Sequence, residues 1–199
     1  MVSDPYPSQI AVSGMVGALT DVSLIINGWT DNGVSANPGD IFFMVVAPNG
    51  QGYEFLGGVG SSHPLNNVNL TLTDSASAVL TSGIITTGSF KPTVLGSSCP
   101  AFPIPAPAVA ECAAPRGTDT FFSEFGGENL DPNGAWSLYI MDNTAGNTAS
   151  TISRGWSVVI DSTGGFVPTP EPSSLALGGL AIGLFAFRKR QNSKRGRPV

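Results

Sequence analysis

Ile41-Phe42-Phe43-Met44-Val45-Val46-Ala47 is an unbroken apolar run that closes at the turn signal Pro48-Asn49-Gly50. Periodicity alone would also allow a helix, because every residue of the run is apolar. Its seven-residue length and its content of Phe and Val favour a β-strand instead. The run therefore predicts a strand that is buried on both faces.

Alternating segments lie on both sides of this run. Trp136, Leu138 and Ile140 would point to one face of a sheet and the residues between them to the other. Similar alternation or apolar content is found at residues 10–12, 22–26, 53–56, 68–72 and 156–160. With 25 Gly and 16 Pro among 199 residues, turns are frequent and long helices are disfavoured. The pattern predicts an all-β fold, a jelly-roll-like β-sandwich of seven to eight strands.

One short helix is expected inside this all-β body. Asp74–Leu80 reads Asp-Ser-Ala-Ser-Ala-Val-Leu, and Asp74 could accept hydrogen bonds from the first backbone N–H groups. Apolar residues make up 41% of the chain, which is enough for a core and excludes wholesale disorder.

The charge of the chain is strongly divided. Residues 1–187 hold all fourteen acidic residues and only three basic ones, Lys91, Arg116 and Arg154, so their net charge is −11. Because nucleic-acid binding depends on a basic surface, this balance argues against a nucleic-acid partner.

The other six basic residues follow position 187 and close a three-part C-terminal segment. Pro170-Glu171-Pro172 comes first, then the apolar and small residues 175–187, then a basic tail at 188–199. Thirteen such residues would form a hydrophobic helix that is short of the roughly twenty needed to cross a bilayer core. Basic residues on one side hold that side in the cytoplasm. The segment is typical of a transient hold in the inner membrane, with everything before it outside the cytoplasm.

This three-part order resembles the PEP-CTERM sorting signal of exopolysaccharide-producing Gram-negative bacteria, over roughly residues 167–195. The resemblance implies that an exosortase cuts near Pro170, Glu171 and Pro172, and that the protein is released or re-attached at the cell surface. An ordinary C-terminal anchor after a Pro-rich linker is the alternative, which the short apolar stretch disfavours.

The domain plan that follows has five parts. An N-terminal stub occupies residues 1–5, the sandwich 6–163, and a Pro-rich linker with the sorting motif 164–174, before the hydrophobic segment and the basic tail. The stub has no basic start followed by an apolar run, as a secretory signal peptide would. Since a sorting signal requires export, we expect the natural start to lie upstream; a cytoplasmic protein with a tail insertion is the alternative.

The body carries a second resemblance, over roughly residues 6–161. It is similar to the P domain (P/Homo B) that follows subtilisin-like proprotein convertases. The most specific blocks are Asn133-Gly134-Ala135-Trp136-Ser137-Leu138 and Gly155-Trp156-Ser157-Val158-Val159-Ile160; the others lie at residues 6–10, 19–22, 38–41, 46–50 and 89–92. The resemblance implies a jelly-roll sandwich without catalytic residues of its own. The chain departs from the family at residues 31–39, which lack the histidine often found there, and it contains no protease domain.

Few residues point to catalysis. His63 is the only histidine and lies in a polar stretch, and no Gly-x-Ser-x-Gly segment supplies a nucleophile for a Ser/His/Asp triad. One His and two Cys cannot provide the four ligands of a zinc site. Cys99 and Cys112 bracket a Pro-rich stretch, and in an exported protein such a pair predicts a disulfide. Two free thiols in a cytoplasmic protein are the alternative.

Calcium is the one cofactor to consider. Asp40, Asp74 and Asp142 each stand at the end of an expected strand, and Glu128 and Asp131 share a loop. Scattered carboxylates can converge on calcium, which takes six to eight oxygen ligands. Some P domains bind calcium, so the resemblance implies the same possibility. Acidic residues in turns more often cap backbone N–H groups, which is the alternative reading.

Three functions are compatible with these features. The first is a non-catalytic surface or matrix protein whose sandwich binds extracellular polysaccharide or another envelope protein. The second is an accessory module of a subtilisin-like serine endopeptidase system. The third, an independent hydrolase, is disfavoured by the lone histidine. Trp29 or Tyr53 could form a carbohydrate platform, although packing in the core explains both more simply.

Overall fold

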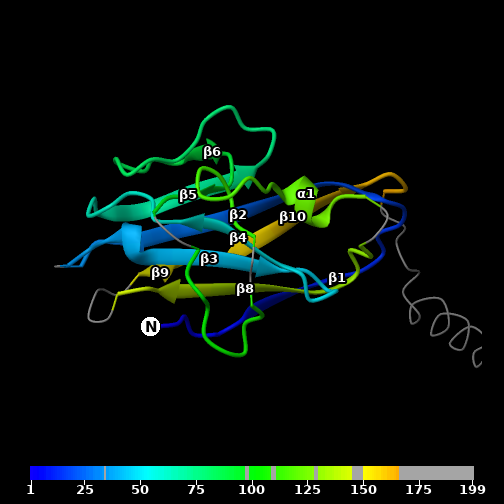
Figure 1. Cartoon of the computed structure of the whole chain (residues 1–199), viewed down its shortest axis with the longest axis horizontal. Coiled ribbons are helices and arrows are strands. Elements are labelled where there is room, and N and C mark those ends of the chain that lie inside the picture. Colours follow the sequence, from blue (N-terminus) through cyan, green and yellow to red (C-terminus); the bar gives the residue numbers. More distant parts are fainter. Residues whose placement is uncertain (34, 97–98, 109–110, 128–129, 145–149, 166–199) are drawn as a thin grey trace, which may run out of the picture. The chain divides into compact units, whose positions relative to one another are not determined.

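The computed structural model is built almost entirely from β-strands, arranged as two sheets packed face to face (Figure 1). It describes residues 1–33, 35–96, 99–108, 111–127, 130–144 and 150–165. Residues Met1–Val167 form one compact unit and Pro168–Val199 a second one, of which nothing is described. The first unit contains the whole described hydrophobic core and is of ordinary domain size, so we expect it to fold by itself.

The first sheet has the strand order β1-β8-β3-β4-β7. Its strands are β1 (Ser8–Val12), β3 (Ile41–Val46), β4 (Gly52–Gly57), β7 (Thr93–Val94) and β8 (Gly134–Asp142). All pairs are antiparallel except β4 with β7. All six residues of β3 are buried, which confirms the strand expected from the unbroken apolar run.

The second sheet has the order β10-β2-β5-β6, and β9 also pairs with β2. Its strands are β2 (Leu19–Asp31), β5 (Leu65–Thr73), β6 (Gly88–Phe90), β9 (Thr151–Ile152) and β10 (Trp156–Ser162). The described residues thus contain more strands than the seven to eight expected, because β6, β7 and β9 have only two or three residues each. Such short pairings leave too little alternation in the sequence to be recognised.

Aromatic side chains fill the space between the sheets. Trp29 of the second sheet meets Phe43 of the first edge to face, with ring centroids 5.1 Å apart. Phe125 packs in the same way against Trp136 at 5.3 Å. These contacts place large aromatic rings between the inner faces of the two sheets. The space between the sheets is therefore the main hydrophobic core.

The helix expected at Asp74–Leu80 is not formed; that segment consists of turns and irregular backbone. A five-residue helix α1 (Phe121–Phe125) lies elsewhere. Thr120 is its N-cap, and the Asp74 carboxylate accepts hydrogen bonds from the backbone N–H groups of Phe121 and Phe122, at 3.1 and 2.8 Å. Asp74 does cap a helix, but one that is 47 residues away in the sequence.

The N-terminal residues, expected to be a stub outside the sandwich, continue the edge of the first sheet. Ser3 N donates to Ile140 O at 3.0 Å, and Asp142 N donates to Met1 O at 2.8 Å. Val2 forms an antiparallel bridge with Met141. Residues 1–3 therefore pair with the last part of β8, beyond the stretch that pairs with β1.

Candidate functional site

A cavity of about 440 Å³ opens between the two sheets where β8 ends and β10 begins. Trp29 and Phe43, both fully buried, form its floor, and Trp156 of β10 lines its side. The remaining lining residues come from the N-terminal segment, from β1, β3, β8 and β9, and from the residues just before β9 and β10: Met1, Val2, Ser3, Asp4, Pro5, Ser8, Ile41, Leu138, Ile140, Met141, Asp142, Ser150, Thr151, Ile152 and Gly155. A volume of this size falls within the range of small-molecule sites.

The polar side chains of this cavity carry hydroxyls and carboxylates, and the amine of Met1 lies beside them. The indole N–H of Trp29 donates to Ser150 Oγ at 2.8 Å, and that of Trp156 donates to Ser8 Oγ at 3.0 Å. Because each serine oxygen only accepts in these bonds, each hydroxyl hydrogen remains available to another acceptor. Among the described residues that line the cavity, Asp4 and Asp142 carry carboxylates and none is Lys or Arg.

Asp142 takes part in hydrogen bonds at the edge of this cavity. Its Oδ1 accepts a hydrogen bond from Thr144 N at 2.8 Å, and its backbone carbonyl accepts one from the Met1 amine at 2.7 Å. Its Oδ2 is buried and has no hydrogen-bond partner in the structure. A buried acceptor without a partner is destabilising, which makes this oxygen a place where a donor or a cation would be stabilised.

The structure brings two of the three proposed calcium ligands near each other and separates the third. Asp142 is paired with Ile41 in the β3–β8 ladder, and Asn143 N donates to the carbonyl of Asp40 at 2.8 Å. Asp40 and Asp142 lie where β3 begins, whereas Asp74 caps α1, near the other end of β3 (Figure 1). Among the residues that the structure describes, no group of three or more His, Cys, Asp or Glu side chains could hold a metal ion.

Two further acidic residues of the calcium hypothesis have other settings. Asp131 binds its own loop: its Oδ1 accepts from the backbone N–H and the side-chain amide of Asn133, and these bonds lower the pKa of its carboxyl. Glu128 lies outside the described residues. Calcium binding stays a prediction that would depend on Asp40 and Asp142, together with backbone carbonyls or water.

Calcium is expected to raise the melting temperature of metal-free protein if this pair contributes to a site, since a ligand that binds only the folded state stabilises it. Asp40→Asn and Asp142→Asn should each remove most of the increase. Asp161→Asn, at an exposed position of β10, is the matched control and should leave it intact. Differential scanning calorimetry is the measurement, and superimposable wild-type curves with and without calcium would end the hypothesis.

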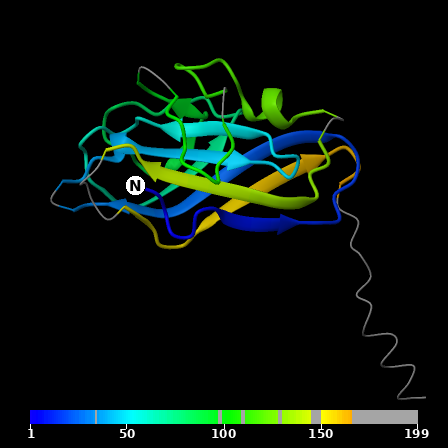
Figure 2. The same cartoon turned by 60° about the horizontal axis from the view of Figure 1, so that its bottom comes forward.

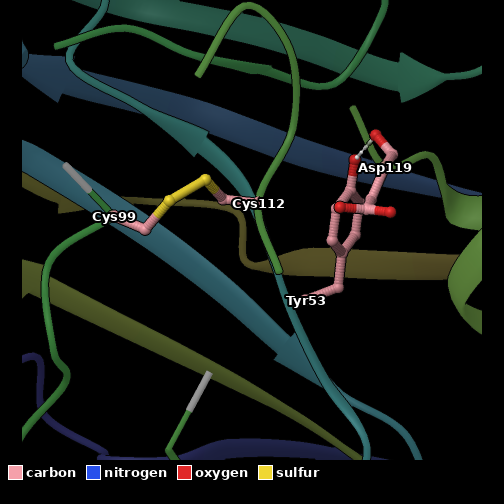
Figure 3. The surroundings of a disulfide bond; sticks show 4 residues. All are labelled: Tyr53, Cys99, Cys112 and Asp119. Atoms are coloured by element: carbon pink, nitrogen blue, oxygen red, sulfur yellow. Dashed lines mark hydrogen bonds between the residues drawn. A yellow bond between two sulfur atoms is a disulfide. The ribbon is translucent and has the colours of Figure 1, made fainter. Parts of the chain in front are cut away.

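Cys99 and Cys112 form the expected disulfide, with their Cα atoms 6.4 Å apart (Figure 3). The residues that lead into and out of Cys112 lie along the edge of β4: Glu54 N donates to Glu111 O at 3.4 Å, and Ala113 N donates to Glu54 O at 3.0 Å. Tyr6 fixes the far part of the closed loop, because its hydroxyl donates to Pro103 O at 2.8 Å. The bond therefore joins the edge of β4 to a loop that crosses the outside of the first sheet (Figures 1 and 2).

Glu54 is a charged residue in an apolar setting. Its neighbours Tyr53 and Phe55 both contact Phe121 in the core, so the Glu54 side chain points to the opposite, outer face of the first sheet. It is nonetheless fully buried, and neither carboxylate oxygen has a hydrogen-bond partner in the structure. Loss of hydration raises the pKa of this carboxyl to about 8.

Tyr53 and His63 have structural surroundings. Burial raises the pKa of the Tyr53 hydroxyl, and nearby acidic residues add to the effect. That hydroxyl donates to the carbonyl of Asp119 at 2.6 Å (Figure 3). His63 is exposed, and its Nδ1 lies 2.9 Å from the carbonyl of Gly60. Trp29 and Tyr53 are both completely buried, so neither offers an exposed carbohydrate platform.

Sequence reasoning missed the cavity and the burial of Glu54. For Glu54 the local pattern indicates the opposite, because an acidic residue that alternates with Tyr53 and Phe55 is typical of the solvent-facing side of a strand. The cavity had no local signal, since its walls combine the N-terminal segment with residues 150–156 and with strands of both sheets.

The sorting motif residues Pro170, Glu171 and Pro172 and the hydrophobic segment lie outside the described residues. No helix in the described part of the chain has the length and apolar character needed to cross a membrane.

Comparison with known proteins gives one match. Residues 168–191 match the family model of the PEP-CTERM protein-sorting motif. No curated protein and no solved structure matches the chain. The chain therefore carries a PEP-CTERM sorting motif behind its β-sandwich, and this motif indicates processing by exosortase and sorting to the cell surface or the extracellular space.

Proposed function

We propose that this chain is a non-catalytic protein of the cell surface or extracellular matrix, whose sandwich binds a saccharide unit of extracellular polysaccharide. The sorting motif at residues 168–191 is the observation that carries the surface location. The motif addresses the protein to the compartment where such a polysaccharide lies. The hydrophobic segment 175–187 holds the precursor in the inner membrane until an exosortase acts on it.

The chemistry of the cavity supports a saccharide. Sugar hydroxyls donate readily to carboxylates, and the cavity offers Asp4 and Asp142 as acceptors and two serine hydroxyls besides. The half-buried indole of Trp156 supplies an apolar surface against which the C–H face of a sugar ring can pack. The two carboxylates of the described lining outweigh the single positive charge of the Met1 amine, which favours a neutral sugar over an acidic one.

One observation also favours the second candidate function, an accessory module of a subtilisin-like endopeptidase system. The blocks around Trp136 and Trp156 that resemble a P domain fall on β8 and β10, one strand in each sheet. A jelly-roll P domain would make the chain an accessory module beside a separately encoded subtilisin-like protease. This alternative rests on the sequence blocks alone, and a protease that co-purifies with the surface protein would favour it.

Replacement of Pro170, Glu171 and Pro172 by alanine is expected to leave the protein uncleaved and associated with the membrane fraction, because the processing enzyme recognises this motif. Intact-mass measurement of fractionated cells distinguishes the precursor from the shortened product. Alanine at the adjacent Ser173 and Ser174 is the matched control and should leave processing unchanged. The same shortened product in all three strains would contradict the proposed sorting route.

Binding of neutral saccharides is expected to raise the melting temperature of residues 1–167, by an amount equivalent to about 2.7 kcal/mol at a ligand concentration one hundred times Kd. A panel of neutral mono- and disaccharides is the probe. Trp156→Ala should remove the increase, and Val159→Ala, on the same strand and 45% exposed, should retain it. No increase with any member of the panel would refute the saccharide site and leave the sorting route untouched.

A further inference from the structure

The disulfide-closed loop presents an apolar tip to solvent. Residues 100–108 contain only Pro, Ala, Phe and Ile, in a unit whose net charge is strongly negative. Ile104 at the tip is 91% exposed, and Pro103 and Pro105 beside it are exposed as well. We call Pro103–Pro105 the knob. Covering a large apolar side chain that is otherwise fully exposed to water lowers the free energy, so a partner that buries Ile104 would be stabilised.

Several contacts fix the position of the knob. The disulfide closes the base of the loop, Phe102 is buried at 8% exposure, and the Tyr6 hydroxyl donates to Pro103 O. A turn follows, in which Ala106 N donates to Pro103 O at 3.1 Å. Because the loop is held in place before any partner arrives, little conformational entropy would be lost on binding.

An apolar groove of about 430 Å³ lies elsewhere on the same unit. Val79, 57% exposed, stands at its rim, and the other lining residues are Leu80, Thr81, Ser82, Thr93, Leu95, Ala114 and Pro115. None of these side chains is charged. The groove thus matches the knob in chemistry: both are uncharged surfaces on an acidic molecule.

The knob and the groove are near opposite edges of the first sheet. The knob is held by Tyr6, whose ring packs edge to face on Tyr139 of β8, next to the edge strand β1. The groove is lined by Thr93 of β7, which is the other edge strand. Two complementary surfaces at opposite edges cannot meet within one molecule, but they can meet between copies in a head-to-tail arrangement.

We propose that the knob of one molecule docks in the groove of a second copy, so that the surface protein associates head to tail. The contact is heterologous and leaves a knob at one end and a groove at the other, so it can repeat along a row of molecules. It does not involve the cavity proposed for saccharides, and it would hold whatever ligand that cavity takes.

The contact is small and is expected to be weak in dilute solution. Dense display at the cell surface or in a matrix raises the effective concentration of neighbours, and repeated weak contacts then act together. Self-association should therefore appear in solution only at high protein concentration.

Sedimentation equilibrium of residues 1–167 over a wide concentration range tests this inference. Ile104→Asp removes the knob and Val79→Glu blocks the groove; each should weaken self-association about tenfold or more, since a buried charge replaces an apolar contact. Both positions are well exposed, so both variants should keep the wild-type melting temperature. Val159→Asp, at a partly exposed position of β10, is the matched control and should associate like the wild type.

An equimolar mixture of the two variants gives the decisive result. Ile104→Asp retains an intact groove and Val79→Glu an intact knob, so the mixture should form one-to-one dimers and nothing larger. If wild-type protein stays monomeric at every concentration, the proposal is overturned, even if a different protein is found to bind the knob. Self-association of Val79→Glu alone at wild-type strength would also overturn it, because it would mean that the groove takes no part.

Discussion

Raising the pH from about 5 to about 9 is expected to lower the free energy of unfolding, by up to about 4 kcal/mol through Glu54 alone. The folded protein keeps this carboxyl protonated, because its pKa is raised to about 8 by burial. In the unfolded chain the same group has an ordinary pKa and loses its proton near pH 4.5. Between these values the folded state binds more protons, so stability falls as pH rises.

Glu54→Gln should flatten this dependence. The amide keeps the shape of the protonated acid and does not ionise, so the variant should be less sensitive to pH across this range. It should be less stable than the wild type at acidic pH, because its two N–H donors are buried without partners. The order should reverse before pH 8, once the wild type has lost more stability through ionisation of Glu54 in its unfolded state than the unpaired amide costs the variant.

Urea unfolding at a series of pH values measures both effects. Glu111→Gln, an exposed residue on the segment beside β4, is the matched control and should follow the wild-type curve. A Glu54→Gln curve parallel to that of the wild type would mean that the Glu54 carboxyl is hydrated and ionised in the folded protein.

The parts of the fold that could be predicted from the sequence are those determined by residues that are adjacent along the chain. The run Ile41–Ala47 is apolar at every position, and β3 is buried at every position, because a central strand between two covered faces needs no polar side. Trp136, Leu138 and Ile140 alternate with their neighbours, and Trp136 and Leu138 lie in the core as expected. The sorting motif was recognisable for the same reason, since its three parts follow one another directly along the chain.

The parts that sequence did not predict depend on segments that are distant in the chain. Asp74 looked like the N-cap of its own helix, yet its carboxylate binds the first backbone N–H groups of α1. No local rule distinguishes the two, because any exposed helix start can accept such a cap. Glu54 is buried on the outer face of the first sheet, where the chain around Cys112 returns to the edge of β4. The local sequence suggests that the Glu54 carboxylate is solvated and ionised. The tertiary structure buries it instead, and burial keeps it protonated at neutral pH.

Removal of the disulfide, by Cys99→Ala with Cys112→Ala, is expected to lower the free energy of unfolding by about 3 kcal/mol at neutral pH in the chain-entropy account of a loop of this length. The fourteen-residue loop from Cys99 to Cys112 would gain freedom in the unfolded chain that the bond now removes. Thermal unfolding of the variant and the wild type measures the loss.

The same variant should also weaken the pH dependence that Glu54 confers. Glu54 bonds through its backbone to Glu111 and Ala113, on either side of Cys112. When the loop is no longer held at its base, water reaches the carboxyl more easily, its pKa falls towards the ordinary value, and the decrease in stability between about pH 5 and about pH 9 becomes smaller. A reducing agent should reproduce both effects in the wild type and change nothing in the variant. If the variant were destabilised but kept the full pH dependence, the loop would stabilise the fold without shielding Glu54.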